Sequence, residues 1–252
     1  MTWPAPWCSW PPQLRTTSTA SYCRSTAGGW PDERSPEPSR FRHPAGEPCG
    51  GSPPRPACPE YAPVIDALVR GGVRSIELTL STDGVFDFLP DIKRQFGADA
   101  EIGVGTVTSG DQATQALDGG ADYLVTPAMV TDVIRAAVAA GVPVFPGGLT
   151  PTELLTGMQA GATAVKLFPA STVGPGYIGQ LRGPFPDMRV IPSGGIGIDD
   201  AADWIAAGAL AVSLGGPLLR DAFSGGDLAA LTDRARQLSS LVADAVQARG
   251  AR

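Results

Sequence analysis

The chain has 252 residues, 43% of them apolar and 17% charged, so it can bury a sizeable core and carries too few charges to be disordered throughout. A net charge of −6 and a sequence pI near 4.8 argue against a nucleic-acid partner, which usually requires a basic face. No run of about 18 apolar residues predicts a membrane span, and residues 1–12 lack the basic and apolar regions of a secretory signal.

Residues 1–59 differ in composition from the rest of the chain. They hold all four cysteines, four of the five tryptophans, 13 of the 25 prolines and the only histidine, His43. The dense prolines and the absence of apolar periodicity predict a disordered or non-native segment without a role in function. The cysteine spacing matches no metal-binding motif, although a disulfide framework or a zinc site with His43 is an alternative. The abrupt change of composition is also typical of translation in a wrong frame or from a wrong start.

Residues 60–252 form the predicted domain, in which 11 Arg and two Lys face 21 acidic residues, a net charge of −8. Apolar, β-branched runs alternate there with amphipathic stretches. The predicted strands cover residues 75–80, 101–107, 123–127, 143–147, 164–169, 189–195 and 211–218. The predicted helices begin near Tyr61, Asp83, Ser109, Thr131, Pro151, Tyr177 and Asp199, and a last one covers about 228–248. Ser109, Thr150 and Asp199 are typical N-cap residues.

Strands that alternate with helices favour a parallel sheet with right-handed crossovers. Seven such units after a leading helix fit an α/β fold, the (β/α)8 TIM barrel, with a first strand that is missing or replaced. A doubly wound open sheet is the alternative. Against it, no GxGxxG follows the first predicted strand, and small or polar residues recur at strand ends, where barrel active sites lie.

The two lysines of the chain stand in different contexts. Lys93 lies in a polar helical stretch and is expected to be a solvated surface cation. Lys166 interrupts the run Ala-Val-Lys-Leu-Phe-Pro, which otherwise reads as a buried strand, and a buried ammonium is costly unless it is paired or functional. Desolvation favours the neutral amine, which attacks carbonyl carbon to form a Schiff base. A lysine that reaches solvent from an edge strand is the alternative.

Glu77 also interrupts an apolar strand, and it shares a strand face with Thr79. Beside Lys166 in a barrel lumen, its carboxylate would complete a coupled acid–base pair that can move protons in enamine chemistry. A purely structural ion pair is the alternative, although buried pairs add little stability. Residues 60–252 contain no His or Cys and only scattered acids, so we expect no metal, although carboxylates alone could hold Mg²⁺.

Glycines end several predicted strands. Residues 193–195 (Ser-Gly-Gly) and 215–216 (Gly-Gly) follow the last two, where barrels commonly present backbone N–H groups to a phosphate. Plain tight turns are the alternative. Residues 103–106 (Gly-Val-Gly-Thr) end another strand and could hold a carboxylate, with close strand–helix packing as the alternative.

Six motifs follow one another along the chain, at residues 71–80 (GGVRSIELTL), 103–107 (GVGTV), 124–127 (LVTP), 145–153 (FPGGLTPTE), 164–170 (AVKLFPA) and 192–196 (PSGGI). In this order they resemble the 2-keto-3-deoxy-6-phosphogluconate (KDPG) and 4-hydroxy-2-oxoglutarate (KHG) aldolases, over about residues 60–245. The lysine motif is the most specific of them.

The resemblance implies a class I aldolase on a (β/α)8 barrel, a cytoplasmic homotrimer that acts on a small-molecule 2-keto acid without metal or other cofactor. Lys166 would attack the C2 ketone, and Glu77 would be the general acid and base. Thr106 would bind the pyruvate carboxylate in a pocket lined by Pro127 and Phe168. The remaining substrate-binding residues, toward the distal phosphate or carboxylate, would be Ser193, Gly194, Gly195, Gly215 and Gly216. The products would be pyruvate with glyceraldehyde 3-phosphate or with glyoxylate.

Three features depart from the family pattern. Ser81 stands where an arginine is usual, Pro217 where a serine is usual, and residues 1–59 contain no recognisable first strand. An arginine recognises an anion with two hydrogen bonds, which serine cannot do, so the phosphorylated substrate is in question. Two alternatives stay open: a different phosphate-binding barrel enzyme, such as an isomerase or a thiamine-phosphate-synthase-like transferase, and an inactive, truncated aldolase.

Overall fold

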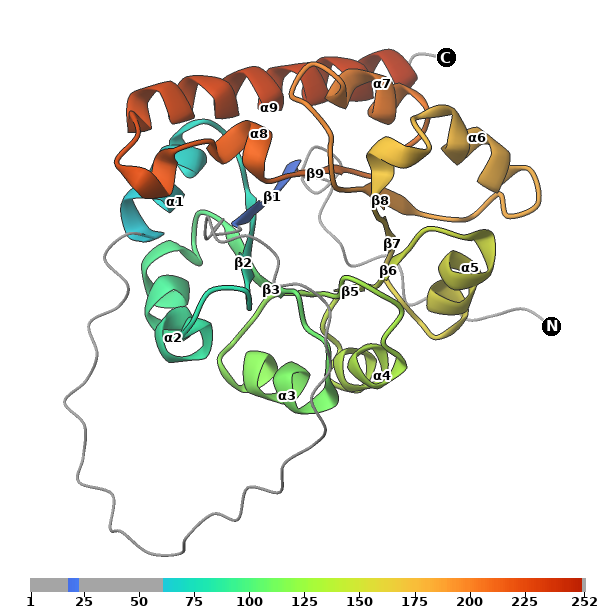
Figure 1. Cartoon of the computed structure of the whole chain (residues 1–252), viewed down its shortest axis with the longest axis horizontal. Coiled ribbons are helices and arrows are strands. Elements are labelled where there is room, and N and C mark those ends of the chain that lie inside the picture. The colour runs from blue at the N-terminus through green and yellow to red at the C-terminus, as the bar shows by residue number, and fades with distance from the viewer. Residues whose placement is uncertain (1–17, 23–60, 251–252) are drawn as a thin grey trace, which may run out of the picture.

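The structure, a computed structural model, describes residues 18–22 and 61–250. Parallel strands lie around the centre of the molecule with the helices outside them (Figure 1). The strands are β1 (Ser18–Tyr22), β2 (Ser75–Thr79), β3 (Glu101–Gly105), β4 (Leu124–Val125), β5 (Val144–Phe145), β6 (Gly147–Gly148), β7 (Val165–Leu167), β8 (Val190–Pro192) and β9 (Val212–Leu214).

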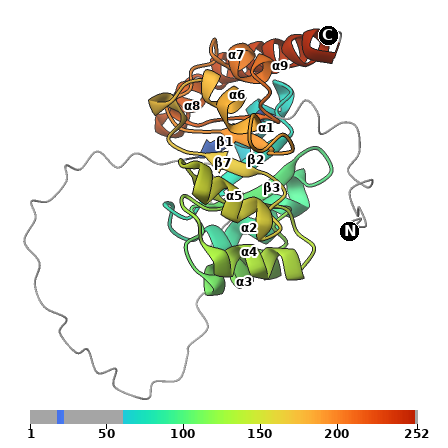
Figure 2. The same ribbon diagram turned by 90° about the vertical axis from the view of Figure 1, so that its right-hand side faces the viewer.

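The α-helices follow the strands along the chain, and two 3-10 turns, Ala170–Thr172 and Ala222–Ser224, stand among them. The helices are α1 (Tyr61–Arg70), α2 (Val85–Phe96), α3 (Gly110–Asp118), α4 (Thr131–Ala139), α5 (Pro151–Gln159), α6 (Gly176–Arg182), α7 (Ala201–Ala206), α8 (Gly216–Leu219) and α9 (Leu228–Gly250). Figure 2 shows α9 at one end of the molecule, close to α7, and α3 and α4 at the other. Within the described residues no helix has the length and apolarity to span a bilayer.

The strand pairs follow one another around a ring. One sheet has the order β5-β4-β3-β2-β1-β9 and the other the order β6-β7-β8. β5 and β6 are two parts of one segment with only Pro146 between them, and Ser193, after β8, bridges Ser213 of β9. The pairing therefore has the strand order of a (β/α)8 barrel, as predicted, and not that of a doubly wound sheet.

The first strand is replaced rather than missing. β1 lies between β2 and β9, where Thr19 is the Cα partner of Ser75 on one side and of Ser213 on the other. This corrects the expectation that nothing in residues 1–59 takes this position. The segment Ser-Thr-Ala-Ser-Tyr lacks the apolar run of a buried strand. It forms a strand because β2 and β9, on its two sides, offer it unpaired backbone groups. The other predictions for residues 1–59 lie outside the described residues.

Some predicted boundaries differ from those of the structure. The strand predicted over 211–218 ends at Leu214, because the backbone at Gly215 (φ −111°, ψ −98°) turns into α8. The predicted N-cap of α7 was wrong by one residue: Asp200 holds that position, and its carboxylate accepts a hydrogen bond from the N–H of Gly197 instead. The predicted cap at Thr150 is confirmed, with a reciprocal capping box.

Strand alternation divides the apolar side chains into two clusters. The larger lies between the strands and the helices, and it contains Ile76 and Leu78 of β2. The smaller lies inside the ring and consists of Tyr123, Val125, Phe145, Ala164, Ile191 and Ala211. On the inner side of β2, by contrast, Glu77 and Thr79 are polar and buried. The polar side of β2 thus faces an apolar interior.

Candidate active site

Lys166 enters the ring from β7. Its neighbours Val165 and Leu167 are fully buried on the helix side, so alternation sends the lysine side chain inward, where 12% of it is exposed. β7 pairs with β6 on one side and β8 on the other. The alternative of an edge-strand lysine is therefore wrong, and the ammonium lies in the interior of the fold.

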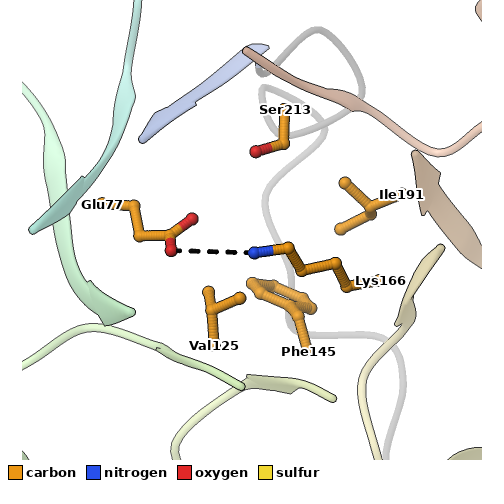
Figure 3. Close-up of a pocket in the computed structure, with 6 residues that line it drawn as sticks. All are labelled: Glu77, Val125, Phe145, Lys166, Ile191 and Ser213. Carbon is orange, nitrogen blue, oxygen red and sulfur yellow. Dashed lines mark ion pairs between the residues drawn. The ribbon is translucent and has the colours of Figure 1, made fainter. Parts of the chain in front are cut away.

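Glu77 reaches the same space from β2, across the ring from β7 (Figure 1). Its Oε1 lies 3.9 Å from Nζ of Lys166, and its side chain is only 2% exposed (Figure 3). This separation is an ion pair beyond hydrogen-bond distance, so neither group is held by a direct bond to the other. The two residues predicted to act as an acid–base pair thus lie together in the structure, on two strands that do not pair with each other.

A pocket of about 220 Å³ of empty space, part of it open to solvent, surrounds the pair. Its lining is Glu77, Val125, Phe145, Lys166, Ile191 and Ser213 (Figure 3). The apolar members surround the two charges and lower the polarity of their surroundings, which strengthens the interaction between the charges. Sequence reasoning had identified only Glu77 and Lys166 of this lining.

Two of the other lining residues carried a signal in the sequence. Ser213 lies two positions after Ala211 and Val125 two positions after Tyr123, so each shares a strand face with a member of the inner cluster. Phe145 and Ile191 belong to the inner cluster themselves, but neither has a second member on its own strand, so their inward orientation followed only from the structure.

The two glycines of β3 make room for side chains inside the ring. A Cβ on Gly105 would lie 1.8 Å from Oε1 of Glu77, and one on Gly103 would lie 2.2 Å from the ring of Tyr123. The Gly-Val-Gly motif therefore serves the close approach of the carboxylate to the backbone, rather than strand–helix packing. Thr106, the next residue, is half-buried with φ 60°, a strained conformation of the kind concentrated at functional sites.

Thr106, Pro127 and Phe168 follow the C-terminal ends of β3, β4 and β7, the same end of the ring. None of them lines the pocket described above. Phe168 is nonetheless linked to it, because Nζ of Lys166 lies 5.4 Å from the centre of the Phe168 ring, which is 38% exposed. This is cation–π distance, so the ring covers the ammonium from the outer side.

The segments that lead into the glycine runs after β8 and β9 lie side by side at Ser193 and Ser213. The hydroxyl of buried Ser193 donates to that of Ser213 over 3.3 Å, and the two residues also bridge through the backbone. Gly194 and Gly195 have φ of 86° and 73°, so a turn here requires their left-handed backbone. Gly216 is exposed, and a Cβ there would meet nothing within 4 Å.

Lys93 is not the solvated cation that the sequence predicts. Its side chain is 22% exposed, and its Nζ lies 2.5 Å from Oδ2 of Asp122. The same oxygen accepts a hydrogen bond from the N–H of Ile102. Next to this pair, burial is the main cause that raises the pKa of Glu101, the charge of Asp122 raises it further, and Lys93 partly opposes the rise. Among the described residues, no group of acidic, His or Cys side chains is placed to hold a metal ion.

The comparison with known proteins agrees with this geometry. The family model described as KDPG and KHG aldolase matches residues 57–233. The 2-dehydro-3-deoxy-6-phosphogalactonate aldolase of Escherichia coli K12 is 37% identical over 157 residues, which cover 62% of this chain and 77% of that protein. The KHG/KDPG aldolase of the same strain is 33% identical over 178 residues, or 69% and 83% of the two chains.

Solved structures point in the same direction. A structure described as native KDPGal has a TM-score of 0.70 at 33% identity and covers 75% of this chain and 90% of its own. The KDPG aldolase of Legionella pneumophila, solved with pyruvate as a covalent carbinolamine, has a TM-score of 0.65 at 25% identity over 70% and 86% of the two chains. Thiamine phosphate pyrophosphorylase of Pyrococcus furiosus shares the fold alone. It is 15% identical with a TM-score of 0.58, over 91% of this chain and 98% of its own.

Proposed function

The chain belongs to the KDPG and KHG aldolase family and is a Schiff-base-forming lyase; from this premise we propose how its residues cleave a 2-keto-3-deoxy sugar acid or 4-hydroxy-2-oxoglutarate into pyruvate and an aldehyde. One observation carries the assignment of residues: Nζ of Lys166 and Oε1 of Glu77 lie 3.9 Å apart within one pocket that has apolar walls. Family membership decides against an isomerase or a thiamine-phosphate-synthase-like transferase.

Lys166 forms the covalent bond to the substrate. Its neutral amine attacks the C2 ketone carbon, the C2–N bond forms, and the carbonyl oxygen takes up a proton to give the carbinolamine. Loss of water from the carbinolamine leaves the iminium ion. This cation is the electron sink that the cleavage step needs.

Glu77 moves the protons. Its carboxylate accepts the proton of the C4 hydroxyl while the C3–C4 bond breaks, and the electron pair of that bond passes to C3 and forms the enamine. The aldehyde leaves, C3 of the enamine is protonated, and water hydrolyses the resulting iminium to release pyruvate and free Lys166. A carboxylate 3.9 Å from the lysine nitrogen is within reach of these positions, directly or through one water.

The residues at the C-terminal ends of the strands bind the two ends of the substrate. Thr106 binds the pyruvate carboxylate, with Pro127 and Phe168 beside it, because all three follow strands at the same end of the ring. The distal group of the substrate is received by the adjoining runs after β8 and β9, namely Ser193, Gly194, Gly195, Gly215 and Gly216.

Borohydride trapping tests the role of Lys166, and the chain has only two lysines to compare. After incubation with pyruvate and borohydride, peptide mapping is expected to find the reduced adduct on Lys166. Lys166→Met removes the adduct and the pyruvate-releasing activity, whereas Lys93→Arg, which keeps its ion pair with Asp122, retains both. An adduct that persists on Lys166→Met protein would contradict the assignment.

The substrate is tested by a pyruvate-release assay with phosphorylated and unphosphorylated 2-keto-3-deoxy acids and with 4-hydroxy-2-oxoglutarate. Ser81, whose hydroxyl lies 2.7 Å from that of Thr79, and Pro217, which has no N–H, offer a phosphate less than the usual arginine and serine do. We therefore expect a smaller preference for phosphorylated substrates than an arginine at position 81 would give. The variant Ser81→Arg is the matched test, and it should raise kcat/KM only for the phosphorylated acid.

We also propose a homotrimer in the cytoplasm. Its support is family membership, together with a designed cage built by fusing symmetric oligomeric domains, which is 32% identical with a TM-score of 0.71 over 76% of this chain and 70% of its own. Light scattering of the full chain gives the mass directly, and a monomer or dimer mass would contradict the trimer. Cell fractionation tests the location.

A further inference from the structure

Tyr123, immediately before β4, is a buried titratable residue without a role in the mechanism above. It is 2% exposed, and its ring lies in the inner cluster, 5.5 Å from the ring of Phe145 between centroids. Its hydroxyl is buried and forms no hydrogen bond with any group in the described part of the chain. Such a hydroxyl costs free energy, and a buried polar atom without a partner therefore calls for an explanation.

The backbone of β3 places this tyrosine directly beside Glu77. The Tyr123 ring fills the space where a Cβ of Gly103 would lie, and the Glu77 carboxylate fills the space where a Cβ of Gly105 would lie. Residues two apart on a strand face the same side, about 6.6 Å from one another. The ring and the carboxylate therefore occupy successive positions along one strand face, with the ring nearer the N-terminal end of β3.

Burial and the charge of Glu77 both affect the pKa of Tyr123. Burial is the main cause that raises the pKa of Tyr123 well above its usual range, and the negative charge of Glu77 raises it further. The Ser75 hydroxyl opposes this rise in the pKa of Tyr123 by more than either Glu101 or Asp122 adds to it, although its contact with the Tyr123 hydroxyl does not have normal hydrogen-bond geometry. The tyrosine is thus a neutral O–H group at every working pH.

We propose that Tyr123 is a positioning residue for Glu77: its ring fixes the carboxylate over Gly105, and its uncommitted O–H dipole stabilises the ionised carboxylate. The proposal rests on the role of Glu77 as acid and base. A neutral donor suits this task, because it favours the anion without adding a charge that would compete with Lys166.

The charged groups around Glu77 and Tyr123 come from several elements. Lys166 of β7 faces the carboxylate. Glu101 of β3 and Asp122 of the following loop act on the pKa of Tyr123, and Lys93 of α2 pairs with Asp122. These groups are unchanged when the tyrosine loses only its hydroxyl, so a change in pH dependence on that substitution reports the hydroxyl itself.

Tyr123→Phe removes the hydroxyl and keeps the ring. We expect the acid limb of the pH profile of kcat/KM to move up by about 0.5–1 pH unit, with a fall of about three- to tenfold on that limb and little change in KM at the optimum. The matched control is Tyr177→Phe, since the Tyr177 hydroxyl donates to the Leu149 carbonyl over 2.9 Å, outside this cluster. Its profile should coincide with that of the unchanged chain.

A direct measurement separates this inference from the proposed function. The chain has seven glutamates, so carboxyl-¹³C glutamate labelling gives a simple spectrum in which Glu77→Gln identifies the Glu77 signal. In Tyr123→Phe that signal should titrate at higher pH than in the unchanged chain.

Three outcomes are then distinct. If Glu77→Gln abolishes cleavage and Tyr123→Phe moves both the profile and the signal, the inference holds. If Glu77→Gln abolishes cleavage but Tyr123→Phe moves neither, the inference is overturned and the proposed function stands. If Glu77→Gln retains cleavage, both are overturned.

Discussion

Gly105→Ala is the sharpest test of the site, because it acts on the position of Glu77 and leaves its chemistry intact. The added Cβ would lie 1.8 Å from Oε1, 2.4 Å from Cδ and 2.6 Å from Cγ of Glu77, whereas ordinary contacts begin at 3.4 Å. The carboxylate oxygen must therefore move by at least 1.6 Å, the difference between these distances. Since three successive atoms overlap with the new methyl group, a rotation of the carboxylate tip alone does not remove the clash.

The displacement predicts a large loss of activity and a smaller loss of stability. A misplacement of about 1 Å in a catalytic group can cost about 100-fold in rate, so kcat/KM should fall by about 10²- to 10³-fold. Forcing a methyl group into a packed interior costs about 1–3 kcal/mol, partly offset by about 0.4–1 kcal/mol because alanine restricts the unfolded chain more than glycine does. The net change in unfolding free energy should be a loss of about 0–2.5 kcal/mol by the same reasoning.

Pyruvate-release kinetics and urea unfolding of the same preparation measure the two effects. Gly179→Ala is the matched control, because a Cβ there meets nothing within 4 Å and the residue lies inside α6, where alanine is favoured over glycine. It should keep full activity and lose no stability. A folded Gly105→Ala protein that retains kcat/KM within about tenfold of the unchanged chain would refute the reasoning, because the carboxylate would then not need its observed position.

Two further predictions concern the fold. Glu101→Gln should raise Tm by about 1–3 °C near pH 7 and leave it unchanged near pH 4. The pKa of this half-buried carboxyl is raised, so the folded state loses stability as the pH rises and the carboxyl ionises. A gain in Tm at both pH values would contradict this cause. Removal of residues 1–60 takes away β1 and exposes the edges of β2 and β9. Because exposed strand edges pair with other chains, the shortened chain should aggregate, which light scattering measures. It should also lose its cooperative melt, which calorimetry measures. A sharp melt of the shortened chain would mean that β1 contributes nothing to closure.

Local patterns were sufficient to predict the fold class and to identify the two residues proposed to react. Lys166 and Glu77 stand out because each is a charge within a strand that is otherwise apolar, and burial of a charge needs a reason that can be recognised without coordinates. The order of strands and helices follows from apolar periodicity for the same reason, since each element must present one face to the core. The cap at Thr150 was equally local, because the hydroxyl and its partner are three residues apart.

Contacts between segments far apart in the sequence could not be derived in this way. Lys93 was misplaced because its partner, Asp122, lies on a different element, and the role of Gly105 was missed because the group that excludes a Cβ there belongs to β2. The replacement of the first strand by residues 18–22 is the extreme case. That segment has no strand pattern of its own, and its structure comes from the open edges on either side.

The amino-acid sequence by itself therefore determined that this chain is a barrel-type lyase with a lysine and a glutamate at its centre. Only the tertiary structure decided that the charged ends of the two side chains lie 3.9 Å apart, that the Glu77 carboxylate occupies the space beside Gly105, and that β1 completes the ring. The physical reason is that burial and periodicity act on each segment separately, whereas distances within a site are set by the closure of the ring, which depends on all strands at once.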